Sequence, residues 1–198
     1  SGNLWLFGGS QSVLNDLWMY AISTNEWTCV RGSGIGNYGT KGVPSMFNDP
    51  WGRQETASNW TDSLNNLWLF GGSGLANSTQ VGSLNNLWKY NIATNEWTWM
   101  SGSDSSNAVG SYGIKGVSSP VNCPSGRLTY CKWKDAEENF YLMGGYASNA
   151  FLNDLWKYNI GVNEWIWING SQIPSSGSYL QYCANDTLNI PAARSEQR

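Results

Sequence analysis

Hydrophobic residues occupy neighbouring positions in several short runs of the chain, so both faces of each predicted strand are apolar. The clearest runs are residues 4–7 (LWLF), 17–20 (LWMY) and 67–70 (LWLF). Apolar side chains on both faces are typical of β-strands that are covered on both sides. The glycine pair after the first and third runs marks a strand end, where the backbone approaches another segment closely or adopts a positive φ. The pattern therefore predicts short, buried β-strands.

These strands belong to a unit that recurs about every 70 residues and occurs three times. Each copy has a strand ending in Gly-Gly, a second strand ending in Tyr, and a Trp seven residues beyond that Tyr. An Asn stands in the turn between Tyr and Trp, where a left-handed backbone conformation is expected. The recurring positions are Gly8, Gly9, Tyr20, Trp27, Gly71, Gly72, Tyr90, Trp97, Gly144, Gly145, Tyr158 and Trp165. Units repeated in this way bury their faces on one another.

This signature resembles the Kelch repeat family over nearly the whole chain. The resemblance implies an all-β fold of Kelch-type β-propeller blades, each a four-stranded antiparallel sheet. We expect about three blades, as an open arc or part of a larger ring, because complete propellers have about 4–8 blades. The expected segments are a partial blade (1–30), a link (31–52), a blade (53–100), a link (101–126), a blade (127–168), a link (169–192) and the first strand of a next blade (193–198).

An arc with two open ends can be explained in two ways. The chain is part of a longer polypeptide, or several copies close a ring together. In the second case residues 193–198 supply the first strand of the blade that begins at Leu4. Both explanations leave apolar end faces that another blade or another chain must cover.

The links between the predicted blades make the repeats longer than a standard Kelch repeat. Residues 36–43 (GNYGTKGV) recur as residues 110–117 (GSYGIKGV), and a degenerate third copy begins at Gly177. A loop that repeats its own sequence has a preferred conformation. Its Tyr and Lys side chains suit contact with a protein or a glycan, or the tyrosines simply pin the link to a blade. The candidate binding residues are Tyr38, Lys41, Tyr112, Lys115 and Tyr179.

Charge and composition argue against several functions. The net charge is −3 and only 13% of residues are charged, so the chain has no basic stripe to bind nucleic acid. The sequence has no run of 18 apolar residues, so no membrane span is predicted. Histidine, the commonest general base and metal ligand, is absent. We therefore expect neither an enzyme nor a cofactor.

Four cysteines allow three complete disulfide pairings. Cys123 and Cys183 both fall in links, and this pair is the preferred disulfide. Cys123 with Cys131 is the local alternative. The remaining alternative is four free thiols in a cytosolic protein.

The sequence contains four N-glycosylation sequons, a number that chance alone would give. Their placement, mostly in predicted loops, together with the low charge, favours an extracellular or cell-surface protein with N-linked glycans; a cytoplasmic location is the alternative. The expected function is a binding module for other proteins or glycans. The alternatives are a structural building block of an extracellular filament or coat, made with further copies, and an intracellular adaptor. The sequon residues are Asn59, Asn77, Asn169 and Asn185.

Overall fold

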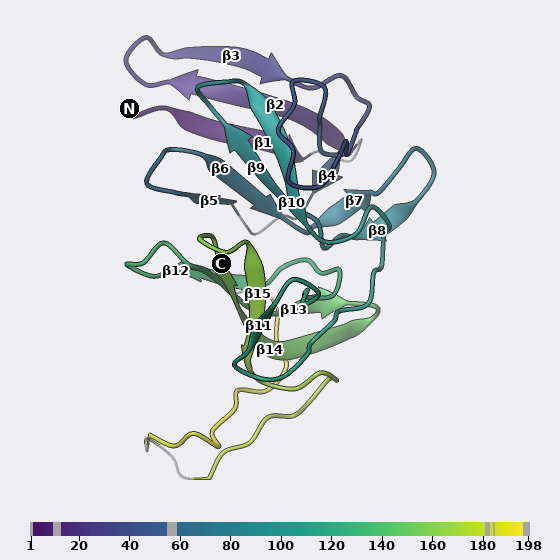
Figure 1. The fold of residues 1–198 in the computed structure, drawn as a ribbon, viewed down its shortest axis with the longest axis vertical. Helices are drawn as coiled ribbons and strands as arrows, with labels where there is room; N and C mark the ends of the chain where they lie inside the picture. The colour runs from purple at the N-terminus through teal and green to yellow at the C-terminus, as the bar shows by residue number, and fades with distance from the viewer. Residues whose placement is uncertain (1, 10–12, 55–58, 181–182, 184, 196–198) are drawn as a thin grey trace.

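The computed structural model describes residues 2–9, 13–54, 59–180, 183 and 185–195. In this part of the chain the fold is all-β and its sheets are antiparallel, as predicted (Figure 1). The strands are β1 (Leu4–Gly9), β2 (Leu14–Ala21), β3 (Glu26–Arg31), β4 (Arg53–Gln54), β5 (Asn59–Thr61), β6 (Leu67–Phe70), β7 (Ser73–Leu75), β8 (Val81–Ser83), β9 (Leu87–Asn91), β10 (Glu96–Ser101), β11 (Ser118–Ser119), β12 (Cys131–Lys134), β13 (Phe140–Ala147), β14 (Ala150–Asn159) and β15 (Glu164–Asn169).

Three sheets correspond to the three repeats and follow one another along the long axis of the molecule (Figure 1). The N-terminal sheet has the order β1-β2-β3, and the middle sheet has the order β10-β9-β6-β5. The C-terminal sheet has the order β11-β15-β14-β13-β12. The middle sheet has the expected four strands, and the N-terminal sheet, predicted as a partial blade, has three. The C-terminal sheet has a fifth strand, because β11 from a link joins it. All are open sheets, and β4, β7 and β8 form a separate small sheet.

The three sheets share one strand register, which the repeated sequence explains. Leu4 pairs with Tyr20, Leu67 with Tyr90, and Phe140 with Tyr158. The turn that follows each tyrosine contains an asparagine with φ near +60°, to which the tyrosine hydroxyl is hydrogen-bonded, so the predicted turn conformation is confirmed. These asparagines are Asn25, Asn95 and Asn163.

The first two glycine doublets stand at a strand end, as predicted: one closes β1 and the other directly follows β6. The third doublet lies inside β13, at an irregularity in its pairing with β14, so that prediction is wrong for the third copy. Gly71 has φ +61°, and a Cβ there would lie 2.8 Å from the carbonyl oxygen of Arg127 and 3.0 Å from that of Leu84. Both the conformation and the close approach therefore require glycine at this point. The amide of the next glycine, Gly72, donates to the Arg127 carbonyl at 2.9 Å. This bond ties the end of the strand to the segment that leads into the next sheet.

Candidate functional site

The junction between the middle and C-terminal sheets is an aromatic contact, and the first junction repeats it. Phe70 packs its ring against Trp165 with centroids 5.2 Å apart, and Phe7 packs against Trp97 at 5.5 Å. Beside each of these pairs lies a second aromatic pair, Trp68 with Tyr158 and Trp5 with Tyr90. Trp97 and Trp165 are each 1% exposed, as expected for large rings that supply much of the buried apolar area. The repeated tryptophans therefore hold each sheet to the one before it.

The first two links fold back onto the sheet that follows them in the chain. We call residues 36–50, 110–124 and 177–191 the first, second and third links. In the first link, Tyr38 packs against Trp88 and Trp99, with ring centroids 5.3 and 4.8 Å away. In the second link, the corresponding tyrosine packs in the same way on the C-terminal sheet. These contacts are Tyr112 with Trp156 and Trp167, at 4.9 and 5.2 Å.

The lysines of the first two links make the same kind of contact. Lys41 Nζ lies 4.4 Å from the ring centroid of Trp99, and Lys115 Nζ lies 4.5 Å from that of Trp167. Both ammonium groups also donate to a backbone carbonyl just beyond the outer strand. Cation–π contact and hydrogen bonding thus engage both lysines within the chain. Of the two sequence-based readings, the packing favours links pinned to a sheet.

A buried arginine crosses the second junction, and the sequence analysis did not identify this role. Arg127 is 0% exposed; its Nη1 and Nη2 donate to the Asp154 carboxylate at 2.6 and 2.7 Å. Tyr112 and Trp156 also donate to this carboxylate. Burial alone would raise the pKa of Asp154, but the Arg127 guanidinium outweighs it and holds this pKa below its usual value.

The first junction has the same arginine but a neutral acceptor. Arg53 Nη1 donates to Asn86 Oδ1 at 2.6 Å and to the Gly71 carbonyl at 3.1 Å. Its Nη2 is buried and has no hydrogen-bond partner among the described residues. Without a carboxylate to offset it, burial lowers the pKa of Arg53 to about 10. The available signal in the sequence is an arginine at the same place after each link, with Arg194 as the third.

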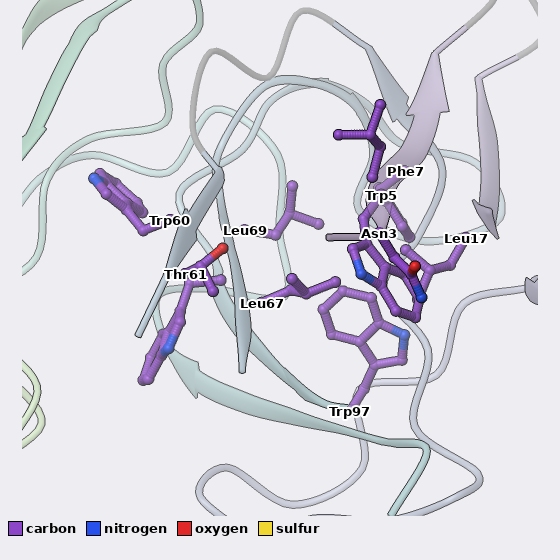
Figure 2. Close-up of a pocket in the computed structure, with 11 residues that line it drawn as sticks. Asn3, Trp5, Phe7, Leu17, Trp60, Thr61, Leu67, Leu69 and Trp97 are labelled. Atoms are coloured by element: carbon purple, nitrogen blue, oxygen red, sulfur yellow. The ribbon is translucent and has the colours of Figure 1, made fainter. Parts of the chain in front are cut away.

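The first junction also contains a cleft of about 240 Å³ (Figure 2). Trp5 and Trp97 lie on one side of it and Leu67 on the other (Figure 2). At the second junction, Trp60 from β5 stacks on Phe140, the counterpart of Leu67, with centroids 4.9 Å apart. The N-terminal sheet has no strand paired to the other edge of β1 among the described residues, so no such ring is supplied. The cleft therefore lies where one more strand, paired to β1, would place a large apolar side chain.

The junction residues are uncovered at the two ends of the stack. Trp27, the counterpart of the buried Trp97 and Trp165, is 55% exposed, which contradicts its predicted place in a blade core. At the other end, Tyr179 of the third link is 68% exposed. The same residue types are thus buried inside the stack and exposed at its ends.

The predicted disulfide between Cys123 and Cys183 is not formed, because both residues carry free thiols. Cys123 is half-buried in the second link, where it is paired with Ser111, and burial raises the pKa of its thiol to about 11. Cys183 is exposed in the third link, which projects away from the sheets (Figure 1). The two cysteines belong to links in different surroundings, one lying on the C-terminal sheet and the other projecting away from the sheets.

The sequon asparagines differ in their surroundings. Asn185 is exposed, whereas Asn77 and Asn169 are half-buried. Asn77 Oδ1 accepts from the Thr79 and Gln80 amides in the turn between β7 and β8. Asn59 lies in β5, and its side chain is outside the described part of the structure.

The described residues contain no group of three or more His, Cys, Asp or Glu side chains placed to hold a metal ion. Nor does this part of the chain form a helix long and apolar enough to cross a membrane. No protein-family model matches the chain, and no curated protein matches it either.

Proposed function

We propose that the chain is a segment of Kelch-type propeller blades that serves as a non-enzymatic structural building block of an extracellular assembly. Support for the Kelch reading comes from the glycine doublets, the Tyr-Asn-Trp turns and the four-stranded order of the middle sheet. These are the features that the sequence resemblance implies.

The observation that carries the structural role is the contrast between internal and terminal copies of one residue. Trp97 and Trp165 pack against the sheet before them and are buried, whereas Trp27 has no such sheet against it among the described residues and is 55% exposed. The same ring that forms the sheet-to-sheet contact inside the stack is therefore available for such a contact at its end. A chain whose surface is built for sheet-on-sheet contact is suited to be one unit of a larger structure.

A protein-binding module is the second candidate, and one observation favours it. Each link has an exposed apolar side chain directly before an asparagine that recurs at the same position in all three links. These side chains are Phe47, Val121 and Leu188. They would serve a protein partner better than a glycan, since the link tyrosines and lysines that suit glycans are engaged within the chain at the first two links.

Native size and glycosylation, measured on protein from its natural source, test the proposed role. We expect a particle far above 21.9 kDa on non-denaturing sizing, and a loss of mass after glycosidase treatment because of a glycan at a site such as Asn185. A small particle would remove the structural role. An unglycosylated protein with free thiols would instead support the cytoplasmic alternative.

A further inference from the structure

We propose that a second copy of this chain docks end-on, so that the C-terminal face of one copy covers the N-terminal sheet of the next. This inference rests on the proposed structural role and names its partner. The occupant follows from the two internal junctions, because the chain builds this contact twice and each end carries one half of it.

The described part of the third link keeps the backbone pairing of a docked link, although no described sheet covers it. Ser178 and Ile190 exchange two backbone hydrogen bonds of 2.8 Å. Ser111 and Cys123 exchange the same pair of bonds in the second link, where the link lies on the C-terminal sheet. Backbone pairing that is already present before docking reduces the conformational entropy that is lost when a sheet arrives. Its tyrosine, Tyr179, occupies the register position of Tyr112.

Arg194 repeats the position and the conformation of Arg127. The Gly145 amide donates to the Arg194 carbonyl at 2.9 Å, as the Gly72 amide does to that of Arg127. The side chains agree as well, because Nε of each arginine donates to the carbonyl two residues earlier, at 2.9 and 3.1 Å. Beyond this point the Arg127 guanidinium bonds to Asp154 in the following sheet. Arg194 therefore has the orientation to pair with a carboxylate, equivalent to that of Asp154, in a sheet docked after it.

The N-terminal sheet offers that acid. Asp16 has the register position of Asp154, and its carboxylate accepts from Trp18 Nε1 at 2.6 Å, as Asp154 accepts from Trp156 at 2.7 Å. Trp18 is half-exposed, whereas Trp156 is fully buried by its junction. The N-terminal sheet thus presents the charge and the ring that Arg194 and Tyr179 require.

The expected contacts follow by copying the second junction. Arg194 pairs with Asp16, as Arg127 pairs with Asp154. Tyr179 packs on Trp18, as Tyr112 packs on Trp156. Met143, the counterpart of Phe70, covers the exposed Trp27. One cation meets one anion and the apolar surfaces are matched, which is the complementarity that selects a partner.

Sedimentation equilibrium on the 198-residue chain, over a two-decade concentration series, tests the proposal. We expect the mass to rise with concentration from 21.9 kDa to at least twice that value. Asp16→Arg and Arg194→Asp should each weaken association about tenfold or more, because each places like charges face to face. Mixing these two variants should restore association, since the intact Arg194 of one meets the intact Asp16 of the other.

Two further variants separate docking from folding. Tyr179→Ser should weaken association, whereas Ile173→Ser, an exposed apolar site in the chain just before the third link, should not. The unfolding midpoints of Tyr179→Ser and Ile173→Ser, measured at a concentration where the chain is monomeric, should match that of the parent. Asp16→Arg and Arg194→Asp also remove a hydrogen bond within the monomer, so restored association in their mixture is the evidence that both remain folded. A chain that stays monomeric throughout, or a mixture of the two charge variants that fails to associate, would overturn the proposal. The structural role would survive that result if the native particle is large, because the end faces would then be covered by something other than a second copy of this segment.

Discussion

A single acid-to-amide difference makes the two internal junctions unequal at the residue scale. Arg127 meets a carboxylate that also accepts hydrogen bonds from Tyr112 and Trp156, so the buried charge is fully paired. Arg53 meets Asn86, and one of its terminal nitrogens lacks a partner among the described residues. A buried polar group without a partner costs about 1–3 kcal/mol, and more when it is charged. The first junction therefore carries an energetic defect that the second one lacks.

Asn86→Asp should repair this defect. The new carboxylate can accept from both terminal nitrogens of Arg53, and the Tyr38 hydroxyl can donate to it as Tyr112 donates to Asp154. We expect a gain of about 1–3 kcal/mol in the free energy of unfolding, measured with urea at pH 7. Asp154→Asn is the reciprocal control and should cost a similar amount. A destabilising Asn86→Asp would contradict this account of the junction.

Acid should remove part of the stability of the C-terminal sheet. The pKa of Asp154 in the folded protein is lowered, so the unfolded chain binds more protons as the pH falls. The contribution of this carboxylate is complete above its unfolded pKa of about 3.9 and disappears as the pH passes down through the lower folded value. Urea unfolding at a series of pH values should show a steeper acid loss for the parent than for Asp154→Asn. Parallel curves would count against a charged pair.

At the scale of elements, the links and sheets show which predictions the sequence permits. Strands, glycine doublets and Asn turns were predictable, because each depends on residues that are neighbours in the chain. The attachment of each link to the following sheet was not, since Tyr112 and Asp154 are 42 residues apart in sequence. The exposure of Trp27 was missed for a related reason, because its repeat position matches that of buried Trp97 and only the missing neighbour differs.

Link docking predicts unequal effects for one substitution at two matched positions. Tyr112→Ala removes a ring that contacts two tryptophans and a hydroxyl that bonds to Asp154, so it should cost about 2–4 kcal/mol. Tyr179→Ala in the exposed third link should change the stability of the monomer by less than about 0.5 kcal/mol. Urea unfolding at low protein concentration measures both. Equal effects would mean that the third link is docked within the monomer.

The sheet junction makes a similar comparison with tryptophan. Trp97→Ala removes a ring that is 1% exposed and packed against Phe7 and Trp88, and should cost about 3–5 kcal/mol. Trp27→Ala, at the exposed counterpart, should cost less than about 1 kcal/mol in the monomer. Thermal unfolding of the two variants checks this. A large loss for Trp27→Ala would show that its ring is covered in solution.

At the scale of the whole molecule, the stack is held more strongly at one end than at the other. The second junction adds to its aromatic contact the Trp60–Phe140 stack and a bond from the Tyr130 hydroxyl to the Phe70 carbonyl. At the first junction, a cleft takes the place of this stack. The acceptor for the buried arginine there is the neutral amide of Asn86. In repeat proteins, stability is close to a sum of unit and junction terms, so these differences add up along the chain.

Hydrogen exchange should therefore rank the sheets. We expect the backbone amides of β1–β3 to exchange faster than those of β13–β15, because the N-terminal sheet can separate at the weaker junction without global unfolding. Mass spectrometry of peptides from the monomeric protein measures this order. Asn86→Asp should slow exchange in the N-terminal part, and uniform exchange across the three sheets would argue for a single cooperative unit.

The link that completes the next sheet has a consequence for how such a chain evolves. Tyr112 and Arg127 precede in sequence the strands that they stabilise. A repeat that starts at a sheet therefore also carries the link and the arginine that bind the next sheet. Each duplicated segment brings both a surface to be covered and the groups that cover the next one. A lineage could therefore lengthen or shorten the array by whole repeats without having to invent a new contact. Asn86, which stands where the other two copies have Asp16 and Asp154, shows that the copies differ at single contact residues.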